Sequence, residues 1–288
     1  MTRANQETVS SPASHPLWTA IRAGMTGASN ALGGNYSMKI ARYLAHGQIS
    51  YGAVEGDSVK ELSASPFEDF TVTDHTHKIS EVKLLAPCEP SKVLAIGLNY
   101  SSHLHDRPAP SEPMVFYKTP NSVIGPDDTI IRPKGTEKLD AEAELVIVIK
   151  DRCHKLTKAN AMEHVLGYTC GNDVSARDWQ RDDRNWWRAK SSDTFTPAGP
   201  YIETDLDPHN VRVTGRINGN EVQGESTTYL IFDVPTILEF TTQYVTLEPG
   251  DMIYTGTPGE PQEMKDGDVC EIEIEGIGVL RNPIKLES

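Results

Sequence analysis

The feature that most constrains this chain is a run of alternating acidic residues that leads directly into an apolar strand. Asp140, Glu142 and Glu144 alternate with alanines, and residues 145–149 are all leucine, valine or isoleucine. A short run of aliphatic and β-branched residues predicts a core strand. Side chains two positions apart leave a strand on the same face, so Glu142 and Glu144 are expected to project side by side. Two like charges entering a core are costly unless something positive lies between them.

A third carboxylate, Asp173, follows in a turn after the apolar segment 165–170. Three oxygen donors without histidine or cysteine among them suit a hard divalent cation such as Mg²⁺, Mn²⁺ or Ca²⁺, and they do not suit zinc. We therefore predict a metal site built by Glu142, Glu144 and Asp173. The alternative interpretation is an acidic strand edge exposed to solvent, because charged residues are mostly exposed.

Composition narrows the class of protein. The chain has 288 residues, 38% of them hydrophobic, and a formal net charge of -14, which opposes binding to nucleic acid or to anionic membranes. No run approaches the roughly 18 apolar residues of a transmembrane helix, and residues 1–16 lack the apolar core of a signal peptide. The cysteines have no metal or redox spacing and are expected to be reduced and buried. They are Cys88, Cys153, Cys170 and Cys270. We expect a cytoplasmic protein that acts on small molecules.

Three segments of different character follow one another along the chain. Residues 1–36 form an appended segment, rich in serine and threonine at its start. Strand-like patterns separated by glycine-containing turns then predict a small N-terminal β domain at residues 37–87. Residues 88–288, reached through a proline-bearing linker, form the larger domain, which carries the candidate site.

Strands dominate the larger domain. They are predicted at residues 92–97, 114–117, 129–132, 144–149, 211–217, 252–255 and 269–274. Helical patterns occur at residues 158–165 and 234–242, the second with Pro235 in its first turn. Because strands do not alternate with long helices, a Rossmann fold and a TIM barrel are disfavoured. The predicted fold class is α+β, with a mixed, mostly β rolled sheet.

Polar residues crowd the chain directly after the predicted strand 92–97. His103 and Asp106 lie three positions apart, so one helical turn would let the carboxylate orient the imidazole. A histidine held in this way can act as a general base. The alternative is a pair of solvated loop histidines, His103 and His105.

Seven short motifs occur in order along the larger domain. They lie at residues 99–103, 116–118, 140–145, 171–180, 190–200, 250–258 and 276–282. With these motifs the chain resembles the fumarylacetoacetate hydrolase family over residues 91–285, and its residues 38–85 resemble that family's small N-terminal domain more loosely. The resemblance implies the family's catalytic β fold and a homodimer.

The resemblance also implies roles for individual residues. A cation, Mg²⁺ or Mn²⁺ with Ca²⁺ as a further option, would bind to Glu142, Glu144 and Asp173. His103, with Asp106 as its acidic partner, would be the general base on a lid, and Lys190 would face the oxo-acid end of the substrate. The other implied substrate contacts are Tyr100, Lys118, Arg177, Asp178, Gln180 and Thr257.

The implied activity is metal-dependent chemistry on a small 2-oxo acid. We predict hydrolysis of a C–C bond in an acylpyruvate-like 2,4-dioxo acid, of the fumarylpyruvate or fumarylacetoacetate type, through a metal-bound enolate. The same enolate follows from loss of CO₂ or from proton movement, so oxaloacetate decarboxylase or tautomerase and hydroxyheptadienedioate isomerase are alternatives. A catalytically silent metal-binding protein is the alternative from another class.

Two places depart from the family pattern. Asp106 replaces the usual glutamate and is one methylene shorter. The segment after Pro258 reads Gly259, Glu260 and Pro261, where a glycine-rich run is usual. This segment is expected to border the distal part of the pocket, so it bears on the identity of the substrate.

Overall fold

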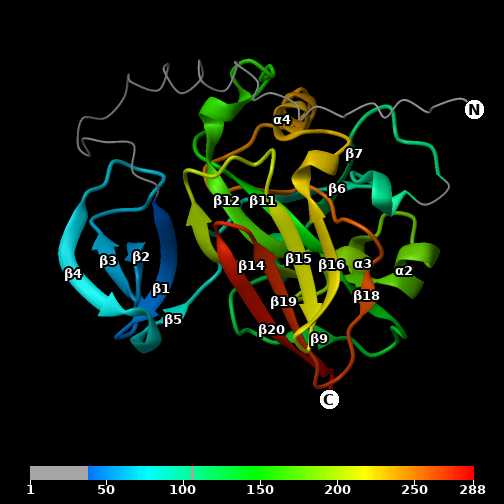
Figure 1. Cartoon of the computed structure of the whole chain (residues 1–288), viewed down its shortest axis with the longest axis horizontal. Helices are drawn as coiled ribbons and strands as arrows, with labels where there is room; N and C mark the ends of the chain where they lie inside the picture. The colour runs from blue at the N-terminus through cyan, green and yellow to red at the C-terminus, as the bar shows by residue number, and fades with distance from the viewer. Residues whose placement is uncertain (1–37, 105–106) are drawn as a thin grey trace, which may run out of the picture. The chain divides into compact units, whose positions relative to one another are not determined.

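The computed structural model describes residues 38–104 and 107–288, which belong to one structural unit (Figure 1). The predictions made for residues 1–36 and for Asp106 lie outside the described residues. Within the described part, no helix is long and apolar enough to cross a membrane.

The described chain begins with an antiparallel meander. Its strands are β1 (Lys39–Ala45), β2 (Gln48–Glu55), β3 (Ser58–Leu62) and β4 (Val72–Lys78). His46 and Gly47 join β1 to β2 with φ angles of 49° and 80°, the left-handed pair that a two-residue hairpin turn requires. β1 also pairs with β14 (Thr196–Glu203), so the meander continues the large sheet of the chain. The strands expected here are confirmed, and the domain boundaries stay a prediction.

The strands of the described residues form three sheets (Figure 1). The largest has the strand order β4-β3-β2-β1-β14-β12-β11-β17-β6-β7, and two short strands lie off this order, β5 (Lys83–Leu84) beside β1 and β8 (Val123–Ile124) beside β14. The strands of this order not yet given are β6 (Val93–Gly97), β7 (Met114–Lys118), β11 (Ala143–Ile149), β12 (Val165–Asn172) and β17 (Met252–Tyr254). A second sheet contains β16 (Asn220–Ser226), β15 (Arg212–Ile217), β19 (Val269–Ile274), β20 (Gly278–Leu286) and β9 (Ile130–Arg132). A small third sheet contains β13 (Ser175–Ala176), β10 (Leu139–Ala141) and β18 (Gln262–Glu263). The expected mostly β, α+β fold is confirmed.

The acidic strand lies at the centre of the large sheet. β11 is buried along its whole length and pairs with β12 on one side and β17 on the other. Its alternate residues enter two different hydrophobic clusters, Leu145 and Ile147 in one and Val146 and Val148 in the other. Burial on both faces explains why the sequence shows a continuous apolar run and not an alternating one. In the register of β11 with β12, Glu144 lies opposite Gly171, which brings the end of β12 to the acidic residues.

Helices are few and short in the described residues. α4 (Val234–Thr242) forms as predicted, with Pro235 at its start and Asp233 Oδ1 accepting from the Thr236 amide at 3.0 Å. The helix predicted at residues 158–165 is wrong. Only the 3-10 turn η4 (Ala161–His164) forms there, because Val165 already pairs with β11 as the first residue of β12.

The remaining helical segments are all short. Two short α-helices that the sequence did not indicate are α2 (Arg177–Asp182) and α3 (Trp187–Ser191). The other 3-10 turns are η1 (Ile79–Glu81), η2 (Ser101–His103), η3 (Pro120–Ser122) and η5 (Thr227–Tyr229). α2, α3 and η2 carry several of the predicted site residues.

Candidate active site

The three carboxylates predicted to bind a metal lie together at one end of the central strands. Glu144 belongs to β11, Glu142 lies one residue before it, and Asp173 follows β12 directly. One carboxylate oxygen from each residue lies within 4.8 Å of the others. The exposed fractions are 3% for Glu142, 2% for Glu144 and 1% for Asp173, so the alternative of a solvent-exposed acidic edge is wrong. We call these three residues the acid cluster.

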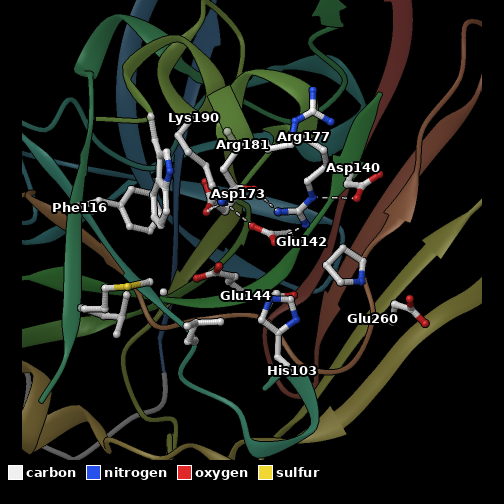
Figure 2. A pocket seen from close by; sticks show the side chains of 18 of the residues that line it. His103, Phe116, Asp140, Glu142, Glu144, Asp173, Arg177, Arg181, Lys190 and Glu260 are labelled. Atoms are coloured by element: carbon white, nitrogen blue, oxygen red, sulfur yellow. Dashed lines mark hydrogen bonds and ion pairs between the residues drawn. The ribbon is translucent and has the colours of Figure 1, made fainter. Parts of the chain in front are cut away.

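Two buried lysines interleave with the acid cluster. Lys190 Nζ lies 2.6 Å from Glu142 Oε2 and 2.5 Å from Asp173 Oδ2 (Figure 2). Lys118 Nζ lies 2.5 Å from the other oxygen of Asp173 and also donates to the Lys190 carbonyl. Burial lowers the pKa of Lys118, an effect that Asp173 opposes. Burial would also lower the pKa of Lys190, but Asp173 and Glu142 hold it above its usual range.

Arg177 at the start of α2 holds the outer side of the cluster. Its Nη2 donates to Glu142 Oε1 at 2.6 Å, and its Nε donates to Asp140 Oδ2 at 2.8 Å. Burial alone would raise the pKa of Glu142, but the Arg177 guanidinium and the Lys190 ammonium hold it well below its usual range. Glu142 is therefore ionised and firmly positioned.

Glu144 has a different environment from its two neighbours. Its Oε2 accepts a hydrogen bond from the Gly256 amide at 2.6 Å. No lysine or arginine forms an ion pair with its carboxylate within the described part of the chain. Burial raises the pKa of Glu144 well above its usual range, and the charges of Asp173 and Glu142 raise it further. Such a carboxyl needs either a proton or an additional cation.

The donor set fits a divalent cation. All three residues offer oxygen atoms, which hard cations such as Mg²⁺, Mn²⁺ and Ca²⁺ prefer. The raised pKa of Glu144 independently indicates that the cluster lacks positive charge at this carboxylate. The buried cluster can therefore hold a divalent metal, as the sequence suggested.

His103 is positioned by backbone atoms of a distant loop. Its Nδ1 lies 2.7 Å from the Gly259 carbonyl oxygen, and the Gly259 amide donates to Ser102 Oγ at 2.9 Å. A carbonyl oxygen can only accept, so Nδ1 carries the proton, and Nε2 is the nitrogen that accepts a proton when the ring is neutral. The ring is turned toward Glu142 and Glu144 in Figure 2. This geometry suits a general base, whereas its predicted partner Asp106 lies outside the described residues.

A cavity of about 550 Å³ opens above the acid cluster. Of the predicted substrate contacts, Arg177, Gln180 and Thr257 line it, together with His103 and Lys190. Other lining side chains that the sequence analysis did not name are Leu98, Arg107, Met114, Lys138, Arg181 and Trp186. Phe116, Glu260 and Pro261 line the cavity too. Phe116 had appeared in the sequence analysis only as part of a motif, and Glu260 and Pro261 only as part of the divergent loop.

Three predicted substrate contacts are not among the residues that line this cavity. Tyr100 is completely buried, and Lys118 is buried beneath Asp173. Asp178 accepts a hydrogen bond from Thr136 Oγ1 at 2.6 Å, which ties α2 to the preceding loop. In this geometry Lys118 and Asp178 support other site residues, and their direct contact with substrate stays a prediction.

The motifs noted in the sequence have matches among known proteins. The profile of a family described as Fumarylacetoacetate (FAA) hydrolase C-terminal matches residues 92–285. A profile described as Rv2993c-like, N-terminal matches residues 38–87. Because the first match covers most of the chain, this protein belongs to the fumarylacetoacetate hydrolase family.

Relatives with similar sequences come from distant organisms. An uncharacterized protein of Archaeoglobus fulgidus is 45% identical over 84% of this chain and 94% of the relative. A Xenopus laevis protein named oxaloacetate tautomerase fahd2, mitochondrial, is 37% identical over 80% of this chain and 76% of the relative. The chain is thus an enzyme-family member with a tautomerase among its relatives.

Solved structures extend the comparison. The 5-carboxymethyl-2-hydroxymuconate delta-isomerase from Mycobacterium smegmatis is 41% identical, covers 87% of this chain and 100% of its own, and superposes with a TM-score of 0.83. Maleylpyruvate hydrolase from Sphingobium sp. SYK-6, solved with manganese (II) ion and pyruvate, is 25% identical at the same coverage, with a TM-score of 0.73. Isomerase and hydrolase activities thus both occur on this fold.

Proposed function

We propose that this protein is a divalent-metal-dependent tautomerase or isomerase that moves a proton along the carbon skeleton of a 2-oxo acid. Relatives named for tautomerase and isomerase activity are 37% and 41% identical, and a structure named fumarylacetoacetate hydrolase is also 37% identical, so identity does not rank the two activities. We rank proton transfer first on the geometry of His103, and the hydrolysis favoured by the sequence analysis becomes the second candidate. The homodimer and the cytoplasmic location stay predictions.

One observation carries the proposal. The Gly259 carbonyl fixes the proton of His103 on Nδ1, so Nε2 is the basic nitrogen of the neutral ring, and His103 lines the cavity that contains the acid cluster. A base with a fixed tautomer beside a cation site is what proton abstraction next to a carbonyl group requires. Proton transfer needs no water molecule placed for attack, which hydrolysis does require.

The residues of the cavity divide the chemistry among them. A divalent cation bound by Glu142, Glu144 and Asp173 would supply Lewis-acid stabilisation of negative charge on an oxygen of the 2-oxo acid. Lys190 Nζ would donate a hydrogen bond to the oxo-acid end. His103 Nε2 would take a proton from carbon 3, and the electron pair of that C–H bond would form the double bond to carbon 2 while the π electrons of the C=O bond move onto the keto oxygen. Transfer of the proton from His103 to that oxygen gives the enol and restores the neutral imidazole.

Hydrolysis of an acylpyruvate remains the second candidate because two similar solved structures are named for hydrolysis. The maleylpyruvate hydrolase structure contains a manganese ion and pyruvate on the same fold. In that reaction, His103 would instead take a proton from water. Release of pyruvate distinguishes this activity from proton transfer.

Proton exchange at carbon 3 tests the proposed function directly. We expect the protein, loaded with Mg²⁺ or Mn²⁺, to catalyse deuterium uptake from D₂O into oxaloacetate, an acylpyruvate or a 2-hydroxydienedioate, measured by NMR. Chelation by EDTA should abolish the uptake. His103→Gln should slow it by roughly 100- to 10,000-fold, the usual contribution of a general base.

A second histidine provides the matched control. His164 pairs with Asp151 at 2.5 Å and does not line the cavity, so His164→Gln should retain the exchange rate. No metal-dependent deuterium uptake on any of the three acids would exclude the proposal. Release of pyruvate from the acylpyruvate faster than deuterium uptake would establish the second candidate in its place.

A further inference from the structure

One side of the cavity is apolar although carboxylates form its floor. The side chains on this side, which we call the apolar wall, are Leu98, Met114, Phe116 and Trp186. All four are only half-buried, so each keeps apolar surface that no other residue covers. Covering such surface is favourable by about 25 cal/mol per Å². The wall therefore favours a ligand with an apolar part.

The apolar wall begins directly beside the acid cluster. Lys190 Nζ lies 5.2 Å from the centre of the Phe116 ring, within cation–π distance. The Phe116 ring in turn lies 5.5 Å from Trp186, edge to face at 79°. Figure 2 shows Phe116 on the side of the cavity that carries Lys190 and Asp173, away from Glu260. A molecule with its oxo-acid end at Lys190 would have the Phe116 ring beside it, and Trp186 packs against that ring.

Two residues of the apolar wall have an unfavourable backbone conformation. Leu98 and Trp186 have φ angles of 55° and 54°, in the left-handed region that bulky side chains rarely adopt. Such conformations cost about 1–3 kcal/mol each and tend to occur where a function requires them. The Trp186 carbonyl accepts the Lys190 amide at 2.9 Å, so the turn that presents Trp186 also positions Lys190.

We propose that the apolar wall binds a flat, apolar tail of the substrate, so that the preferred substrate is a 2-oxo acid with an aromatic tail that carries no charge. This inference rests on the proposed function for the oxo-acid end. The size of the cavity agrees, because about 550 Å³ lies in the range typical of drug-sized ligands and exceeds the needs of a four-carbon acid such as oxaloacetate.

A tail that ends in a carboxylate is the competing candidate. Lys138 and Arg181 line the cavity, but Lys138 already pairs with Asp140 at 3.4 Å and Arg181 with Asp182 at 2.8 Å. Arg107, which also lines the cavity, is the cation most suited to a distal carboxylate. The test therefore includes an acid of this kind.

Two adjacent tryptophans allow a sharp experiment. Trp187 follows Trp186 directly, is 68% exposed and does not line the cavity. We would compare kcat and KM of the metal-loaded protein for 2,4-dioxo-4-phenylbutanoate, for fumarylpyruvate and for oxaloacetate. Trp186→Ala should reduce the preference for the phenyl acid over oxaloacetate about tenfold, mainly through KM, since an aromatic contact is worth about 0.5–1.5 kcal/mol beyond its buried area.

The control variants define the outcomes. Trp187→Ala should keep the preference of the unchanged protein, and Trp186→Phe should keep most of it. An equal loss for both acids in Trp186→Ala would overturn the proposal, as would an equal effect of Trp187→Ala. A wild-type preference for fumarylpyruvate over the phenyl acid of tenfold or more would favour the carboxylate-ended tail. If Trp186→Ala does not fold, Phe116→Leu tests the same wall and should shift the preference in the same direction.

Calorimetry separates this inference from the proposed function. If no acid is turned over, the proposed function fails, but binding of the phenyl acid to the metal-loaded protein still tests the wall. Titration calorimetry should then give a Kd that Trp186→Ala weakens about tenfold and Trp187→Ala leaves unchanged. A Kd that is the same in all three proteins would show that the wall does not bind the tail.

Discussion

The acid cluster and the apolar wall face the same cavity but are held in place in different ways. The acid cluster is fixed by the ends of β11 and β12 and by a continuous series of ion pairs through Lys190 and Arg177. The wall depends on irregular backbone, with Leu98 and Trp186 both in the left-handed region. Regular strands thus fix the chemistry, while loops and turns set the surface that a substrate tail would contact.

Within the acid cluster there is a second, smaller contrast. Glu142 and Glu144 lie two residues apart and have similar burial. Glu142 has cationic partners on both of its oxygens, whereas Glu144 has a backbone amide. The pKa of Glu142 is held below its usual range and that of Glu144 is raised above it. Two chemically identical side chains therefore have opposite effects on the stability of the metal-free protein.

The largest expected effect concerns the support of the acid cluster. Arg177→Leu leaves Asp140 and Glu142 buried without their guanidinium partner, and we expect the free energy of unfolding to fall by about 3–5 kcal/mol. Urea denaturation measures this loss. Arg181→Leu, on the same helix, is the matched control, because the Arg181 side chain is 74% exposed and its loss should leave the free energy of unfolding essentially unchanged. Similar losses in both variants would contradict the proposed support role.

The next effect tests the contrast between the two glutamates. Glu144→Gln should lower metal-dependent turnover by about a hundredfold or more. Replacing even a residue that only contacts a metal ligand lowers metal affinity or activity roughly 10- to 100-fold. In metal-free protein at pH 7, however, Glu144→Gln should raise Tm, because the raised pKa of Glu144 means that folding must either bind a proton or bury a charge there, and glutamine does neither. Glu142→Gln should lower Tm because it weakens charged hydrogen bonds worth about 1.5–3 kcal/mol each.

The pH dependence follows from the direction of the Glu144 shift. Because its folded-state pKa is raised, the folded protein keeps a proton that the unfolded chain has already released. The stability of the EDTA-treated protein should therefore fall as pH rises from the usual carboxyl range through the raised pKa. Thermal unfolding at a series of pH values checks this, and Glu144→Gln should flatten the profile. A profile that does not change in the variant would mean that folding does not raise the pKa of Glu144.

The smallest expected effect concerns the side of the cavity away from Phe116. Glu260 lines the cavity there, in the loop that departs from the family pattern. If the substrate tail lies on the apolar wall, Glu260→Gln should change kcat/KM for the phenyl acid by less than about twofold, since exposed charges contribute little. A change in kcat/KM as large as that of Trp186→Ala would show that the tail lies next to Glu260 and not on the apolar wall.

The sequence was sufficient for the acid cluster because local rules decide it. The alternation at residues 140–144 places Glu142 and Glu144 on one face, and the apolar run that follows requires burial. Lys118 could not be placed in the same way. Its burial under Asp173 depends on the packing of β7 against α3, which are far apart in the sequence.

The backbone at Trp186 and the helix predicted at residues 158–165 show where the local sequence was not enough to predict the structure. Nothing in the residues around Trp186 signals a left-handed backbone, since neither glycine nor asparagine occupies that position. The helical pattern at residues 158–165 was overridden by the pairing of Val165 with β11. At residues 158–165 a strand pairing with β11, which lies outside that short window of sequence, determined the conformation.

Gly259 holds Ser102 and His103 through two hydrogen bonds. Both use main-chain atoms of Gly259, and the space around its α-carbon is open. Neighbouring side chains in the loop, such as Glu260, can therefore be exchanged without altering which imidazole nitrogen holds hydrogen. The rim of the cavity can therefore change in sequence while the His103 ring keeps its position.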